Sequence, residues 1–329
     1  MSSKSDSMLD QYRRIKAKHR DEILFFRLGD FYEMFNEDAQ EASAILDLTL
    51  TKRQGLPMCG IPYHAAKAYI ARLLKAGKKV AICEQKALSN NKRGLMDREV
   101  VEVITPGTAL EDDYLEQGTN NYLADICIID QSLCFAYLDV STGEFRAFSL
   151  AFKREMVAET IRAELYRLSP REILVQQSIL DQPKLFQVIR ECGSIIEAQP
   201  DWVYDISHSL ELLKKKFGIV SLKGFGFEDN APEIAAAGNL LEYVQEMIRK
   251  NCPHIRALLP YEEKEYVLLD EATKRNLELV KNLSDSSKRD TLIEVIDKTK
   301  TAGGARLLRQ WLFQPLRIRE KIEERLEAI

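Results

Sequence analysis

The sequence predicts a multidomain α/β protein, and three observations support this prediction. Its 329 residues exceed the roughly 100–200 of an ordinary domain. Helical and strand patterns alternate over about residues 1–110, and three short β-runs between 122 and 150 lead into further alternation. From residue 266 onward the pattern is mainly helical. We therefore expect a mixed α/β domain, a second α/β domain and the start of an all-α region.

The first domain is predicted to span 1–112 and to begin with a basic amphipathic helix over 7–20. Met8, Tyr12 and Ile15 share one face of this helix. A buried strand over 23–28 ends in a turn at Gly29. The later elements are a helix over 37–48, a strand over 48–52, a turn-rich loop over 54–62, a helix over 64–76, and strands over 80–85 and 100–104.

An acidic, polar stretch at 113–121 is the predicted linker, and the second domain follows over 122–250. Three β-runs joined by short turns open it, and helix and strand then alternate. Residues 251–329 are predicted to be mainly helical and to stop inside a helix without a cap, so we expect a longer parent. The main elements here are strands over 122–129, 133–140, 144–150 and 172–176, and helices over 156–168, 233–249, 271–283, 291–297, 305–313 and 319–329.

The net charge of −4 conceals an asymmetry along the chain. Residues 1–110 carry 18 Lys and Arg against 14 Asp and Glu, whereas the remaining 219 residues carry 29 against 37. A basic N-terminal part indicates a polyanionic partner, because Lys and Arg that neutralise phosphates release counterions. A solvated surface with uneven Lys explains the same charges, so composition alone leaves both interpretations open.

Missing motifs limit the chemistry. No apolar run is long enough to span a bilayer and the start has no signal-peptide pattern, so we expect a cytoplasmic protein without membrane contact. Six scattered cysteines form no C-x-x-C pair, which favours reduced thiols over a zinc site. No phosphate loop, G-x-S-x-G or H-E-x-x-H is present. We therefore expect no enzyme activity, catalytic residue, cofactor or metal in this chain.

Three carboxylates leave a nuclease open as an alternative. Asp125, Asp139 and Glu144 lie in or beside the three β-runs of the second domain. An RNase H-like nuclease would hold catalytic metal ions with carboxylates placed in this way. No fourth ligand or histidine occurs at a matching position, so we expect the second domain to be inert and to transmit or dock.

The segment 29–35, GDFYEMF, carries the strongest indication of function. Strand alternation puts Phe31, Glu33 and Phe35 on one face, and an unpaired carboxylate between two aromatics is costly to bury. The pattern therefore favours an exposed edge from which Phe31 and Glu33 project. An exposed phenylalanine on a basic domain can act as a wedge between bases. Phosphates repel a carboxylate beside it, so that carboxylate favours binding only where a base donates a hydrogen bond to it. If Phe31, Tyr32 and Phe35 are all core residues, the interpretation of Phe31 as a wedge fails.

Nine short motifs occur in a fixed order along nearly the whole chain. They are GDFYEMF (29–35), LTLTKR (48–53), GIPYHA (60–65), AICEQ (81–85), ITPGT (104–108), GFGFE (224–228), AAAGNLLEY (235–243), LDEATKRNLEL (269–279) and GARLLRQWLFQPL (304–316). In order and approximate spacing they resemble the bacterial DNA mismatch-recognition proteins of the MutS family. The resemblance implies a mismatch-binding domain (1–112), an RNase H-like connector (122–250) and the truncated start of a helical core (251–329).

The family's Phe-x-Glu motif falls on Phe31 and Glu33. The resemblance implies that Phe31 stacks on a mispaired base from the minor groove while Glu33 hydrogen-bonds it. Lys52 and Met58 are two further DNA contacts that it implies. Glu102 stands where the resemblance leads us to expect a basic residue, which puts one phosphate contact in doubt and leaves the Phe-x-Glu site untouched. Ala302–Gly303 also replaces a commoner Pro-Met pair.

The resemblance also implies partners and activities. These are double-stranded DNA with mismatches or small loops, a homodimer of the full-length protein and a downstream repair factor at the connector. ATP and Mg²⁺ would be bound only by an ATPase domain of the parent that this chain lacks. Besides the nuclease, a scaffold that binds no DNA stays open as an alternative.

Overall fold

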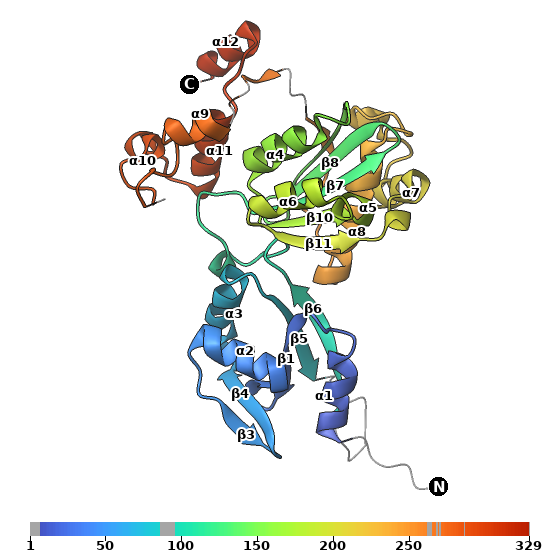
Figure 1. The fold of residues 1–329 in the computed structure, drawn as a ribbon, viewed down its shortest axis with the longest axis vertical. Helices are drawn as coiled ribbons and strands as arrows, with labels where there is room; N and C mark the ends of the chain where they lie inside the picture. The colour runs from blue at the N-terminus through green and yellow to red at the C-terminus, as the bar shows by residue number, and fades with distance from the viewer. Residues whose placement is uncertain are drawn as a thin grey trace. The chain divides into compact units, whose positions relative to one another are not determined.

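The computed structural model describes residues 7–85, 96–261, 265–267, 269, 271–285 and 287–328. Residues 1–6 and 86–95, which belong to the predicted first domain, lie outside the described residues. The chain divides into two compact units, each with its own sheet (Figure 1). Unit 1 comprises Met1–Leu115 and Tyr243–Cys252, and unit 2 comprises Glu116–Glu242 and Pro253–Ile329. The predicted mixed α/β class is confirmed, whereas the predicted domain boundaries stay a prediction.

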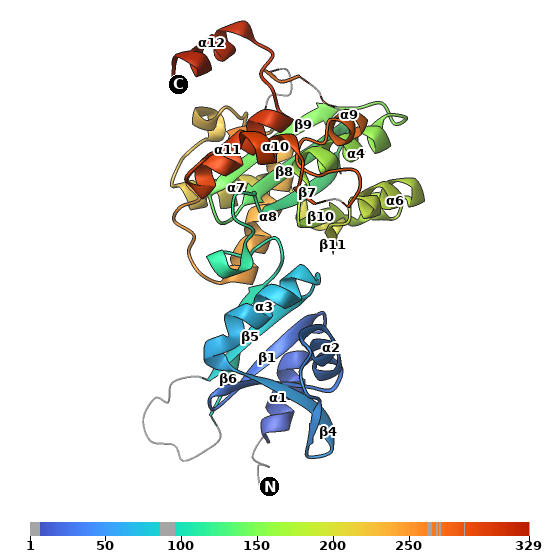
Figure 2. The same cartoon turned by 90° about the vertical axis from the view of Figure 1, so that its left-hand side faces the viewer.

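Unit 1 is built on a mixed six-stranded sheet in the order β3-β4-β2-β1-β5-β6. Strands β1 and β5 run parallel, and the other neighbours are antiparallel. Helices α2 and α3 cover one face of this sheet and α1 packs on the other (Figure 2). The elements are α1 (Met8–Lys16), β1 (Glu22–Leu28), β2 (Phe31–Phe35), α2 (Asn36–Leu46), β3 (Thr51–Arg53), β4 (Leu56–Pro62), α3 (Ala66–Lys75), β5 (Lys79–Gln85) and β6 (Arg98–Ile104).

The loop predicted over 54–62 is wrong, because residues 56–62 form the interior strand β4. Two prolines gave this segment the composition of a loop. Pro57 pairs only with β3 and Pro62 only with β2, so each ring leaves a gap on one side of the ladder. The turn at Gln54 and Gly55, both with positive φ, closes a two-residue β3–β4 hairpin.

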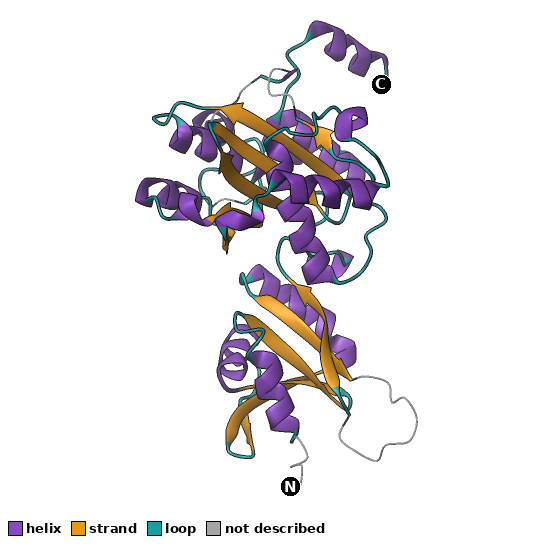
Figure 3. Ribbon diagram, turned by 90° about the vertical axis from the view of Figure 1, so that its right-hand side faces the viewer, coloured by secondary structure: helices purple, strands orange, loops and turns teal. Residues whose placement is uncertain are grey.

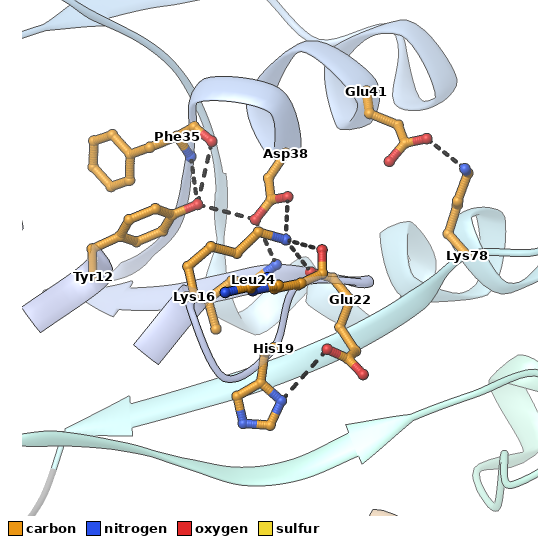
Figure 4. Close-up of polar contacts among 10 residues, drawn as sticks. Tyr12, Lys16, His19, Glu22, Leu24, Phe35, Asp38, Glu41 and Lys78 are labelled. Carbon is orange, nitrogen blue, oxygen red and sulfur yellow. Dashed lines mark hydrogen bonds and ion pairs between the residues drawn. The ribbon is translucent and has the colours of Figure 1, made fainter. Parts of the chain in front are cut away.

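A buried carboxylate joins α1 and α2 to strand β1 (Figure 4). Asp38 on α2 is 5% exposed. Its Oδ1 lies 2.8 Å from Lys16 Nζ of α1, and its Oδ2 accepts from the Tyr12 hydroxyl (3.0 Å) and the Leu24 amide (3.1 Å). Burial raises the pKa of Asp38, and the hydrogen bond from Lys16 opposes this shift. The network fixes the end of β2, because the Phe35 amide donates to the Tyr12 hydroxyl at 3.4 Å.

Replacing Tyr12 by Phe is expected to loosen β1 and β2 by about 1 kcal/mol, the usual net value of one hydrogen bond. Such a loss speeds amide hydrogen exchange about fivefold wherever exchange follows the opening equilibrium. Mass spectrometry of peptides from residues 22–35 measures it, and peptides from unit 2 are the internal control. Unchanged exchange in residues 22–35 would show that the hydroxyl adds no stability.

Unit 2 has a second mixed sheet in the order β11-β10-β7-β8-β9-β12, with helices packed on it (Figure 3). Strands β7, β8 and β9 form the predicted antiparallel set, and β10 and β11 continue the sheet parallel to β7. Helices α4 and α6 share a core with β7, β8 and β10. The bounds are β7 (Tyr122–Ile129), β8 (Ser132–Asp139), β9 (Glu144–Ala151), α4 (Val157–Leu168), β10 (Glu172–Gln176), α5 (Gln177–Leu180), α6 (Pro183–Glu191), β11 (Ile195–Gln199), α7 (Ile206–Phe217), α8 (Glu233–Ile248) and β12 (Leu259–Pro260).

The last part of unit 2 is helical, as predicted. The helix predicted over 271–283 is shorter, because α9 ends at Asn276 and Glu278 has a positive φ that no α-helix continues through. Leu279, Val280 and Ile293 form a small core there. The helices are α9 (Glu271–Asn276), α10 (Leu292–Ile296), α11 (Ala302–Phe313) and α12 (Arg319–Glu327). No helix in the described part of the chain is long and apolar enough to cross a membrane.

Candidate nucleic-acid interface

Strand β2 carries Phe31 and Glu33 on one face of the unit 1 sheet. Phe31 follows the tight turn at Gly29, which has a φ of 59°, and its side chain is 46% exposed. Phe35 is buried below α1, whereas Tyr32 and Met34 are buried against the α2 and α3 side. The sequence predicted an exposed sheet edge, but β2 lies between β4 and β1. Phe31 is therefore accessible because it lies at the open end of an interior strand.

Glu33 forms an ion pair with Arg53, which the sequence pattern did not predict. Arg53 Nη1 on β3 lies 2.5 Å from both Glu33 carboxylate oxygens. The Glu33 side chain is 13% exposed and that of Arg53 is 42% exposed. Gly60 of β4 pairs with Glu33 across the sheet. In the unbound structure the carboxylate is thus already neutralised by a half-exposed guanidinium.

The register separates the two other predicted contacts. Met58 pairs with both Phe35 and Thr51, so it shares the face of Phe31, Glu33 and Arg53. Lys52 pairs with Pro57 and belongs to the opposite face of the hairpin, where it is exposed. The structure thus brings Met58 towards the Phe-x-Glu pair and leaves Lys52 apart from it, and both DNA contacts stay predictions.

A cation and two aromatics gather beside the turn between β1 and β2. The Arg27 guanidinium lies 3.7 Å from the centre of the Tyr63 ring, which is 44% exposed. The Tyr32 hydroxyl donates to the Glu84 carboxylate, and Arg27 Nη1 lies 3.8 Å from the same oxygen. Burial, aided by Glu84, raises the pKa of Tyr32. An exposed aromatic stacked with an arginine offers a surface for a base or sugar.

Glu102 is engaged within unit 1. Its Oε2 accepts from Lys250 Nζ at 2.6 Å. Arg249 in the same segment donates to the Val100 carbonyl. Glu102 therefore has a cationic partner, which limits its repulsion of a nearby phosphate.

Of the three carboxylates in the second domain, Asp139 and Glu144 lie side by side, because both accept from the Asn120 side-chain amide at 3.1 and 3.4 Å, whereas Asp125 has partners of its own. Asp139 accepts from the Ser141 hydroxyl (2.6 Å) and from the Asn121 amide (3.1 Å), which ties the turn after β8. Glu144 accepts from the Tyr122 hydroxyl at 2.8 Å. Among the residues that the structure describes, no three His, Cys, Asp or Glu side chains are grouped as metal ligands. Because these carboxylates serve local hydrogen bonds, the nuclease alternative is not favoured.

Asp125 is fully buried in β7 and has its own polar partners. The Tyr204 hydroxyl donates to Oδ1 at 3.0 Å, and the Asn239 amide donates to Oδ2 at 2.6 Å. Burial raises the pKa of Asp125 well above its ordinary value, against the effect of both hydrogen bonds. The folded protein therefore holds a proton here over a pH range in which the unfolded chain has released it.

Because the folded pKa is raised, stability should fall as pH rises above the ordinary Asp value, by up to about 1.4 kcal/mol per pH unit for one proton. Asp125→Asn removes this titration and should flatten the slope. Urea unfolding at several pH values, followed by tryptophan fluorescence, measures how the free energy of unfolding of unit 2 depends on pH. Both tryptophans, Trp202 and Trp311, lie in this unit. The neighbouring exposed Asp201→Asn, which keeps Asp125, is the control. An unchanged slope in Asp125→Asn would mean that Asp125 is ionised in the folded state.

Family models match the chain in three consecutive parts. "MutS domain I" matches residues 6–113, "MutS domain II" matches 121–256 and "MutS domain III" matches 272–329. Phe31 and Glu33 lie in the first part, and the connector carboxylates lie in the second.

Curated relatives named "DNA mismatch repair protein MutS" align along the whole chain. The protein of Treponema denticola is 47% identical over 100% of this chain and 38% of its own length. That of Treponema pallidum is 43% identical over 98% of this chain and 36% of its own length. That of Desulforapulum autotrophicum is 41% identical over 99% and 37%. The chain thus spans less than two fifths of the length of these relatives.

Proposed function

The chain belongs to the MutS family, and from this membership we propose that unit 1 tests duplex DNA for mispaired or unpaired bases. Membership of this family implies DNA mismatch recognition in general. The observation that supports the detailed site is the exposed Phe31 beside the Glu33–Arg53 ion pair on one face of the unit 1 sheet. An aromatic anchored this way can enter a base step without distorting its own strand.

In this proposal Phe31 acts as a wedge from the minor groove. Unstacking a paired base step costs a few kcal/mol, and a mispair has lost part of that stacking already. Insertion is therefore selective for sites that kink easily, whatever the identity of the bases. Glu33 adds a hydrogen bond to a base donor, and Met58 on the same face adds apolar contact next to the wedge.

The ion pair with Arg53 determines how much free energy Glu33 needs to bind a base. The ion pair must open or be shared before the carboxylate can bind a base. On paired DNA no donor rewards this opening, so the pair stays closed and Arg53 stays engaged. On a mispair the carboxylate turns to the base, and the half-exposed guanidinium becomes available to a phosphate.

Further properties are proposed for the longer parent. An ATPase domain outside this chain would bind ATP and Mg²⁺, the parent would form a homodimer, and a downstream repair factor would dock on the connector, 122–250. The connector would be RNase H-like in fold and catalytically inert. The protein would act in the cytoplasm.

Anisotropy titration of the 329-residue chain with labelled paired and mispaired duplexes of equal length tests the proposal. We expect tighter binding to the mispair, and a fall in log K with log salt of about 0.9 for each phosphate contacted. Equal affinities at every salt concentration would refute mismatch recognition by this chain. Absence of any binding would favour the scaffold, and Mg²⁺-dependent cleavage lost in Asp139→Asn would favour the nuclease.

A further inference from the structure

A cavity of about 800 Å³ lies inside unit 2 and is independent of the proposed mismatch site. It is bordered by Glu116–Tyr122, by the end of α4, by α9 and by α11, which Figure 1 labels. Pockets of 300–1,000 Å³ are typical of small-molecule sites. The cavity is therefore large enough for a nucleotide or an anion of similar size.

The charge of the lining is one-sided. Seven lining side chains are cationic, whereas Glu116 is the one carboxylate among the described lining residues. Glu116 is already shared, because Lys288 Nζ lies 2.7 Å and Arg171 Nη2 lies 3.2 Å from its oxygens. These two cations share one acidic partner, so cations outnumber carboxylates among the described residues of the lining.

Arg309 on α11 is partly buried in this lining. It stacks on Phe313, with 5.3 Å between its guanidinium carbon and the ring centre, and the described residues give it no ion pair. Burial lowers the pKa of Arg309; Glu116 opposes this shift and Arg171 adds to it. Two guanidinium groups in one partly desolvated cavity repel each other, and an anion between them would relieve both costs.

Other cations extend the positive lining around Arg309. Arg275 and Lys281 are exposed and contribute no ion pair within the described chain. Arg167 lies deeper, and its Nη2 is 2.6 Å from Glu164. Tyr137 and Tyr166 add aromatic rings to the same lining. Cations on several sides suit an anion that bears charge along its length.

We propose that this cavity binds a compact oligophosphate, either free in solution or as the phosphate chain of a nucleotide. Arginine forks match phosphate oxygens in two parallel hydrogen bonds, and lysines add point charge. Monovalent anions would satisfy one cation at a time, so an oligophosphate gains most from this arrangement. The aromatic rings provide a surface for a base if the phosphates belong to a nucleotide.

Isothermal titration of the 329-residue chain with sodium tripolyphosphate tests the proposal. We expect saturable binding at one site, weakened at most slightly by sulfate at equal ionic strength. Titrations with ATP and with adenosine distinguish a free oligophosphate from the phosphate chain of a nucleotide. Tighter binding of ATP than of tripolyphosphate assigns the site to a nucleotide, and equal binding assigns it to the phosphate chain. Either result supports the site, whereas an absence of saturable binding, or equal displacement by sulfate, overturns it.

Variants locate the binding. Arg309→Gln is expected to weaken tripolyphosphate binding about tenfold, as for loss of a charge-assisted hydrogen bond. Lys281→Gln removes an exposed cation, which leaves the fold intact, and should weaken binding severalfold. Lys184→Gln makes the same charge change on an exposed residue of α6 outside the lining and should bind as wild type. Equal affinities in all three variants, or displacement of tripolyphosphate by duplex DNA with the same Arg309 dependence, would overturn the proposal.

Discussion

Phe31→Ala is expected to lower affinity for mispaired DNA by about tenfold to a hundredfold, while affinity for paired DNA stays nearly constant. The ring is 46% exposed, so it contributes little to the core of unit 1. Stacking of a base on an aromatic side chain is worth about 1–3 kcal/mol, and alanine removes it completely. The loss therefore falls on the mispair, where the wedge is inserted, and not on contacts with phosphates. Anisotropy titrations of both duplexes at one salt concentration measure the effect.

Two variants control this experiment. Phe31→Tyr keeps a flat ring and should retain most of the preference for the mispair. Val101→Ala truncates another exposed apolar side chain, 37% exposed on the edge strand β6, and should leave both affinities unchanged. Equal losses on paired and mispaired duplexes in Phe31→Ala, with an unchanged circular dichroism spectrum, would show that the ring supports the domain and recognises no mispair.

The sequence predicted those parts of the fold in which periodicity and composition agree. Helix α2 and strands β7 to β10 have strong apolar patterns and clear stops, and they occur close to the predicted positions. The prediction was wrong for β4, because one glycine and two prolines outweighed its alternating pattern, although Cys59 and Ile61 face the core. Tertiary pairing on both sides stabilises a strand that local propensity disfavours.

The same error concealed part of the candidate site. With 54–62 assigned to a loop, no register between β3 and β4 could be predicted, and only this register brings Arg53 to Glu33. A Gln-Gly turn between two short alternating runs is the signal that could have shown it. The exposure of Phe31 could be predicted without knowing how the strands pair, because an aromatic next to a turn can be recognised from the sequence of one strand.

The Glu33–Arg53 pair leads to the second large effect, which has opposite signs on the two duplexes. Glu33→Ala removes a carboxylate and releases Arg53 to phosphates. We expect affinity for paired DNA to rise severalfold, and the slope of log K against log salt to steepen by about 0.9 for the added phosphate contact. Preference for the mispair should fall about tenfold, because a hydrogen bond from a base to a carboxylate is worth about 1.5 kcal/mol.

Arg53→Ala tests the pairing from the other side. It leaves Glu33 without its cation, so affinity for paired DNA should fall while preference for the mispair persists, since the carboxylate stays free to accept from a base. A double-mutant cycle over the two residues gives their coupling in unbound and bound states. If Arg53 has no part in the site, both changes simply add.

Glu41→Ala is the matched control, because it also removes a carboxylate from unit 1 and frees a lysine, Lys78, whose Nζ lies 2.5 Å away. It reproduces the change in net charge at a position outside the β2–β4 face. We expect it to raise affinity for both duplexes by a similar small factor and to leave the preference for the mispair intact. If Glu33→Ala and Glu41→Ala change both affinities equally, Glu33 acts through net charge alone, and Phe31 is left as the source of discrimination.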